Sequence, residues 1–182
     1  AAVTGSTSIM IDNFNNSING KDELYSRAIN LTGASALNVS FKYAFARRDT
    51  SNRDQLYLYT VSSCGGTALP RFNAIGAALE TVPVTTSPFY PTSSSDWRLV
   101  SNSILSAQFT SGFRLKFLFN KSGGNNIFID DINIDISTAT KDISETIDLL
   151  LLGGEYREIT GAFVGSMAST NLKAMRFAKA FV

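Results

Sequence analysis

Apolar and polar residues alternate with a period of two along most of the chain up to about residue 136. In the clearest case, the segment 36–46, every second position is apolar: Leu37, Val39, Phe41, Tyr43 and Phe45. Side chains of an extended strand point alternately to its two faces, so this pattern gathers the apolar side chains on one face. The sequence therefore predicts a half-buried β-strand here.

The same alternation predicts further strands. It is strong in residues 54–62, 113–119 and 126–136, and weaker in 8–11, 24–31 and 97–105. Pairs typical of turns lie between the segments: Asn19-Gly20, Gly65-Gly66 and Gly123-Gly124. Many short strands with turns between them, and no clear helix before residue 140, predict an all-β fold, an antiparallel jelly-roll β-sandwich.

The pattern changes after residue 137, where the alternation of aromatic residues ends. Residues 137–154 place Ser and Thr before acidic residues, then leucines, then Gly153-Gly154, which predicts a short capped helix. Residues 169–182 predict a basic terminal helix. We therefore expect a sandwich over 1–137 and a C-terminal, partly helical extension of unknown role over 138–182.

Composition then excludes several classes of function. The 182 residues include no histidine and one cysteine, Cys64, which excludes Ser-His-Asp and Cys-His catalysis and zinc sites built on histidine or several cysteines. A net charge of +1 gives no indication of nucleic-acid binding. The longest strongly apolar run, 147–152, is too short to span a membrane. We expect a protein that is not an enzyme.

Oxygen-bearing side chains gather in residues 125–135, and the candidate ligands among them are Asn125, Asn126, Asp130, Asp131 and Asp135. Carboxylate and amide oxygens beside a glycine turn are ligands that Ca²⁺ prefers. Adjacent aspartates on a strand point to opposite faces, so both join one site only if a bulge re-aims one of them. The alternatives are a structural calcium site, or aspartates held by salt bridges or backbone hydrogen bonds.

Three other groups of residues are weaker candidates. Asp22 would supply a further calcium ligand if the first and last strands pair, although we favour the simpler interpretation, a plain turn followed by a strand. The charged residues of 47–54 fit either a ligand-binding loop or, as we expect, a solvated hairpin tip. Phe89, Tyr90 and Trp97 would suit a sugar-binding platform, although aromatic residues of a sandwich are more often core.

Six segments in order carry a resemblance to a known family. They are "NFNNSINGKDELYSRAINLTG", "ALNVSFKYAFA", "RDQLYLYTVSSCGG", "LPRFNAIGAALET", "FYPTSSSDWRLV" and "GFRLKFLFNKSGGNNIFIDDINI". Together, over about residues 5–136, they resemble the jelly-roll accessory module of cytophagalysin-like secreted metalloproteases of Bacteroidota. The resemblance extends more loosely to cleaved-adhesin and MAM-type sandwiches.

The resemblance implies a secreted or cell-surface accessory domain for adhesion or ligand binding. It also implies structural calcium near the closing aspartates, which here are Asp130 and Asp131, with Asp22 less directly. Family members begin with a further strand, so the resemblance leads us to expect a partner chain that supplies a first strand. The alternatives are a structural subunit of a surface assembly or virion completed by strand exchange, and a carbohydrate-binding domain. The expected partner is a protein or glycan ligand.

Overall fold

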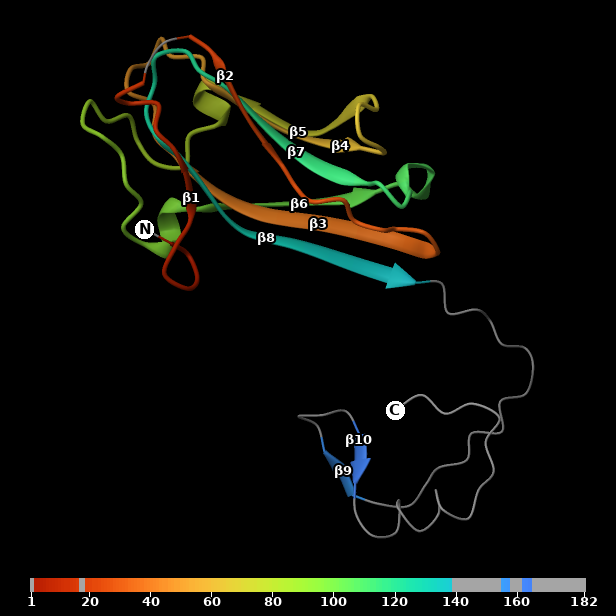
Figure 1. The fold of residues 1–182 in the computed structure, drawn as a ribbon. Helices are drawn as coiled ribbons and strands as arrows, with labels where there is room; N and C mark the ends of the chain where they lie inside the picture. Colours follow the sequence, from red (N-terminus) through yellow and green to blue (C-terminus); the bar gives the residue numbers. More distant parts are fainter. Residues whose placement is uncertain (1, 17–18, 139–154, 158–161, 165–182) are drawn as a thin grey trace, which may run out of the picture. The chain divides into compact units, whose positions relative to one another are not determined.

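The computed structural model describes residues 2–16, 19–138, 155–157 and 162–164. Residues up to 138 form eight strands arranged in two layers (Figure 1). The strands are β1 (Ile9–Ile11), β2 (Lys21–Tyr25), β3 (Ala34–Phe45), β4 (Gln55–Val61), β5 (Ala68–Ile75), β6 (Arg98–Ile104), β7 (Arg114–Asn120) and β8 (Ile127–Thr138). Three short 3₁₀ turns complete this part: Gly76–Ala78, Ser94–Asp96 and Ser106–Gln108.

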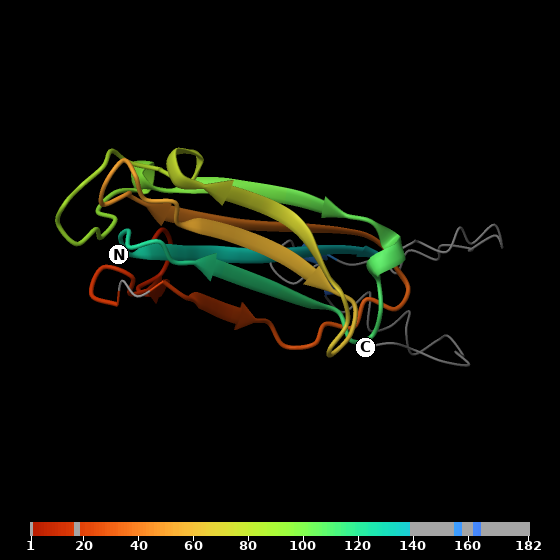
Figure 2. The same cartoon turned by 90° about the horizontal axis from the view of Figure 1, so that it is seen from above.

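The order of the strands identifies the fold. One sheet has the order β1-β8-β3-β6 and the other β2-β7-β4-β5, and every pairing within them is antiparallel. Figure 2 shows β5, β4, β7 and β2 side by side in their sheet. Two four-stranded antiparallel sheets connected in this way form a jelly roll, which confirms the predicted fold class.

The core lies between the two sheets. Phe41 of β3 contacts the rings of Phe72 and Phe117 edge-on, with centroid distances of 5.5 and 5.0 Å. The apolar positions that alternate along β3, from Leu37 to Phe45, are at most 2% exposed. The period of two therefore identified the buried face of this strand correctly.

Strand β5 is the one that the alternation did not predict. It contains Pro70, which cannot donate a backbone hydrogen bond, and a register shift in its pairing with β4 lies between Leu58 and Tyr59. It forms the edge of its sheet, where proline is tolerated. Strand β2 also differs from the prediction, because it spans Lys21–Tyr25 whereas the sequence predicts a strand over 24–31. Near the end of the predicted segment, Ile29 forms an isolated bridge with Phe113.

The contacts within the chain group residues 1–139 as one compact unit and residues 140–182 as another. In the second unit the structure describes an antiparallel pair of strands, β9 (Glu155–Arg157) and β10 (Ala162–Val164). The two predicted helices, in 137–154 and 169–182, fall almost entirely outside the described residues, and residues 137 and 138 belong to β8. Among the described residues no helix has the length and hydropathy needed to cross a membrane.

Candidate functional site

The two aspartates predicted to bind calcium lie at an irregularity of β8. Along the pairing with β3, Ser40 faces Asn133 whereas Lys42 faces Asp130, so β8 has one residue more than β3 in this stretch. Asp131 adopts a φ of +48° there, a left-handed conformation that Asp and Asn tolerate better than most residues. This is a β-bulge, and it removes the strict alternation that would point the two carboxylates to opposite faces.

Both carboxylates turn toward the N-terminal segment. Asp130 accepts hydrogen bonds from the backbone N–H of Val3 at 2.7 Å and from that of Asp131 at 2.8 Å. Asp131 accepts a hydrogen bond from the hydroxyl of Thr4 and pairs with the Lys42 ammonium at 3.0 Å. These two hydrogen bonds hold the pKa of Asp131 below its usual value.

The third predicted ligand lies in the other sheet. Asp22 belongs to β2, and its carboxylate pairs with the Lys121 ammonium at 2.7 Å. Across the described part of the chain, no three His, Cys, Asp or Glu side chains lie close enough together to share a metal ion. The calcium prediction for Asp130 and Asp131 stays a prediction, and Asp22 is not brought to them.

The predicted aromatic platform is divided between core and surface. Phe89 is 8% exposed, and its ring meets that of Phe128 edge-on at 6.0 Å. Trp97 is half-buried against Phe128 at 6.5 Å, so both residues belong to a second small core, as expected. Tyr90 is 53% exposed, and its ring lies 5.9 Å from that of Phe128 at a tilted angle.

The loop 47–54 contains a residue whose role the sequence did not reveal. Asp54 was expected on a solvated hairpin tip, and this expectation is wrong, because Asp54 is fully buried. Its Oδ1 accepts hydrogen bonds from Asn13 Nδ2 at 2.9 Å and from the backbone N–H groups of Ser122 and Gly124 at 2.8 and 3.4 Å. A buried carboxylate needs such donors, so Asp54 ties three segments together at this end of the sandwich.

A different surface has the composition of a binding site: the outward face of the sheet β2-β7-β4-β5. Along β4, Leu56 and Leu58 are buried in the core, whereas Tyr57 and Tyr59 alternate with them and lie half-buried on the outside. The rings of Tyr57 and Tyr59 stack at 5.2 Å. Tyr25 of β2, 48% exposed, shares this face, which we call the tyrosine face.

Lys116 connects the tyrosines across three strands. Tyr25, Lys116 and Tyr59 are partners in the register of β2, β7 and β4. The Lys116 ammonium lies 5.2 Å from the ring centroid of Tyr25 and 6.0 Å from that of Tyr59. It also pairs with Glu23 at 2.6 Å. This hydrogen bond raises the pKa of Lys116 and lowers the pKa of Glu23, so the pair is ionised at neutral pH.

Amide side chains border the tyrosines. Gln55 Nε2 donates to the Tyr57 hydroxyl at 2.6 Å and to Asn73 Oδ1 at 2.7 Å. Asn120 Nδ2 donates to Gln55 Oε1 at 3.3 Å. Among the described residues no hydrogen-bond partner is found for the buried Oδ1 of Asn120. The face thus combines flat aromatic surface with hydrogen-bonding groups held in fixed positions.

A hollow of about 400 Å³ adjoins the tyrosine face at the end of β4. Tyr25 belongs to both the face and the hollow. Arg114, the first residue of β7, contributes a half-buried guanidinium, one nitrogen of which donates to the carbonyl of Ser26 at 2.9 Å. The remaining lining residues come from β4 and the loop that follows it: Val61, Ser63, Cys64 and Gly65.

Sequence reasoning missed the tyrosine face, although its signal was present. In "LYLY", residues 56–59, both sets of alternating positions are apolar or aromatic, so periodicity alone does not say which set faces the core. Leu56 and Leu58 face inward, and tyrosine is the residue that tolerates the outward position, because its hydroxyl reaches water.

No family model matches the chain. Among solved structures, the chain is similar to the C-terminal domain of EclA, described as a sugar-binding protein, at 14% identity over 72% of this chain and 81% of that one, with a TM-score of 0.43. It is also similar to a cleaved adhesin domain of Lys-gingipain from Porphyromonas gingivalis, at 14% identity over 64% of this chain and 65% of that one, with a TM-score of 0.45.

A third similar structure is CBM27-1 of Caldicellulosiruptor saccharolyticus in complex with mannohexaose, at 17% identity over 69% of this chain and 72% of that one, with a TM-score of 0.40. Likenesses of this size are too distant to assign a function to this chain.

Proposed function

We propose that the chain is a non-catalytic, saccharide-binding module that acts outside the cell, and that the tyrosine face is its binding surface. The observation that carries the proposal is the outward row of Tyr25, Lys116 and Tyr59, with Tyr57 stacked beside Tyr59. A pyranose ring presents an apolar C–H surface that packs on an aromatic ring, while its hydroxyl groups need hydrogen-bond partners. Aromatic surface with a few fixed polar groups meets both needs.

The polar groups beside the tyrosines are already oriented. The hydrogen bonds that Gln55 makes to Tyr57 and Asn73 hold the amide in one orientation before any ligand arrives. A preorganised site loses less side-chain entropy on binding than a flexible one. The rigid sheet beneath the face, whose inward side chains belong to the core, supports this geometry.

The state of the carboxylate on the tyrosine face favours binding over hydrolysis. Among the described residues Glu23 is the carboxylate that lies on the tyrosine face, and it is engaged by Lys116 at 2.6 Å. Glycoside hydrolysis ordinarily uses two carboxyl groups, one of them protonated as a general acid. Because the pKa of Glu23 is lowered, this carboxyl is ionised at neutral pH and unsuited to that role.

The test is a microarray of neutral, uronate-containing and sulfated oligosaccharides, followed by calorimetry with those that bind. We expect Tyr59→Ala and Tyr57→Ala each to weaken binding by about tenfold or more. Tyr90→Ala is the matched control, since Tyr90 is an exposed tyrosine that lies off the face, and we expect it to bind as the wild type does. Silence of the array, or equal losses in Tyr59→Ala and Tyr90→Ala, would refute the proposal; binding to a protein ligand alone would favour an adhesion module.

We also retain structural calcium at Asp130 and Asp131 as a proposal. Two observations support it: the bulge turns both carboxylates to one side, and they line a hollow of about 250 Å³ together with the hydroxyl-bearing residues Thr7 and Ser8. Oxygen ligands of this kind suit Ca²⁺. Donation of a strand by a partner chain likewise stays a prediction.

A further inference from the structure

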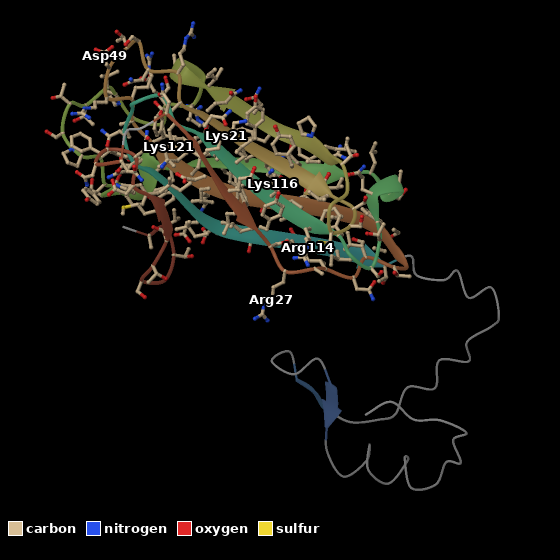
Figure 3. The ribbon with its side chains drawn as sticks, turned by 45° about the horizontal axis from the view of Figure 1, so that its top comes forward. Lys21, Arg27, Asp49, Arg114, Lys116 and Lys121 are labelled. Carbon is tan, nitrogen blue, oxygen red and sulfur yellow. The ribbon has the colours of Figure 1, made fainter. Side chains whose placement is uncertain are left out.

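Positive charge is concentrated along β2 and β7, the strands that carry Tyr25 and Lys116 of the tyrosine face. Figure 3 shows Lys121 and Lys21 toward one end of β2 and β7, Lys116 near the middle, and Arg114 toward the other end. The whole chain has a net charge of only +1, so this concentration reflects where the fold places the charges. A surface of one sign attracts ligands of the opposite sign.

The two carboxylates of β2 neutralise only part of this charge. Asp22 pairs with Lys121 at 2.7 Å and Glu23 with Lys116 at 2.6 Å. Among the described residues no salt bridge joins Lys21, Arg27 or Arg114 to a carboxylate. The region therefore keeps a net positive charge after its internal ion pairs have formed.

Arg114 has the geometry of an anchor for an anion. Its side chain lines the hollow beside Tyr25, and the hydrogen bond to the Ser26 carbonyl at 2.9 Å fixes one guanidinium nitrogen. A guanidinium has five N–H donors, and no other hydrogen bond of this side chain is found among the described residues. In a concave, partly desolvated site, such a fork of free donors binds a carboxylate or a sulfate through two parallel hydrogen bonds.

We infer that the saccharide bound by the tyrosine face is acidic, and that Arg114 binds its anionic group in the hollow while the sugar rings pack on Tyr25, Tyr57 and Tyr59. The inference rests on the proposed function, because it names the class of saccharide for the same surface. Uronate carboxylates and sulfate esters share the required chemistry.

The experiment compares matched charged and neutral probes by calorimetry at low salt. The probes are an oligogalacturonate and its methyl ester, and a sulfated galactan oligosaccharide and its desulfated form. We expect wild-type protein to bind at least one acidic probe about tenfold more tightly than its neutral counterpart. Added salt should reduce this preference, since the contacts are partly exposed. The pair that shows the preference identifies the anion as carboxylate or sulfate.

Three variants test the role of Arg114. Arg114→Gln should abolish the preference, so that the acidic probe binds no more tightly than its neutral counterpart. Arg114→Lys should restore only part of it, because an ammonium keeps the charge but lacks the planar fork. Arg48→Gln is the control, since it removes the same charge from a residue that lies over the ring of Phe14, away from the hollow.

A gain-of-function variant keeps the inference testable if Arg114→Gln does not fold. Glu23→Gln removes the negative charge that Lys116 now neutralises, so the ratio of the affinities for the acidic and the neutral probe should rise about threefold or more. Neutral and acidic probes bound equally, with Arg114→Gln behaving as wild type, would overturn this inference and leave the proposed function standing. No saccharide bound at all would overturn both.

Discussion

A Cβ atom placed on Gly124 would lie 1.9 Å from the buried Oδ2 of Asp54. The backbone of Gly124 does not need glycine for its conformation, because its φ is not positive. Glycine is required because the Asp54 carboxylate occupies the space that a Cβ atom would need. The backbone N–H of Gly124 also donates to the other oxygen of the same carboxylate, so loop 121–126 and the start of β4 fit together only when this residue has no side chain.

Gly124→Ala should therefore destabilise the fold by about 2–3 kcal/mol, through overpacking and the loss of hydrogen bonds to Asp54. Gly112→Ala is the matched control, because a Cβ there would make an ordinary contact of 3.6 Å with the backbone of Ser63. Urea unfolding followed by tryptophan fluorescence measures both. Equal midpoints for the two variants would show that the carboxylate can move away at little cost.

The aromatic contact between the sheets should dominate the stability of the sandwich. Phe41 is fully buried and packs against Phe72 and Phe117 of the opposite sheet. Phe41→Ala should cost about 3–5 kcal/mol. Leu99→Ala, at a position of β6 that is 61% exposed, should cost less than about 0.5 kcal/mol. Thermal unfolding of the two variants compares them directly, and a smaller loss for Phe41→Ala than for Leu99→Ala would contradict this account of the core.

Stability should fall in acid partly through Asp131, whose pKa is lowered from 3.8 by the Thr4 hydroxyl and then by Lys42. A carboxyl with a lowered folded pKa contributes stability that is present above its unfolded pKa and is lost as pH falls through the folded value. The advantage of the wild type over Asp131→Asn should thus be full well above about pH 4 and be lost progressively as the pH falls from there through the lower folded pKa.

Asn is the matched replacement for Asp131, because it tolerates the φ of +48°. Urea unfolding with chelator present, repeated between about pH 2 and pH 6, measures the difference in unfolding free energy. A difference that stays constant over this range would mean that neither the hydrogen bond from Thr4 nor the ion pair with Lys42 stabilises the ionised carboxylate.

The calcium proposal predicts a shift in melting temperature. A ligand that binds only the folded state stabilises it, by about 2.7 kcal/mol at a hundred times its dissociation constant. Calcium should therefore raise the melting temperature of chelator-treated protein, and Asp130→Asn should remove most of the rise. Asp22→Asn is the control, since Asp22 lies in the other sheet and pairs with Lys121. A melting temperature that chelator leaves unchanged would eliminate the site.

The sequence alone determined the all-β class and most of the strands, because the alternation of apolar residues reports directly which side of a strand is buried. It indicated the face of β3 that carries Phe41, and it named a bulge at Asp130 and Asp131 as the condition for a site shared by both. It did not predict β5, since Pro70 interrupts the pattern there, and only the pairing with β4 shows that the residue lies on an edge strand.

The candidate binding surface was decided by the tertiary structure. Tyr57 and Tyr59 alternate with two leucines, and packing against the opposite sheet determines which pair is covered. Arg114, Tyr25 and the loop after β4 are far apart in the chain and meet because β7 lies between β2 and β4. The local pattern therefore determined which segments are strands. Long-range pairing determined which strands lie side by side, and it thereby decided which residues share a site.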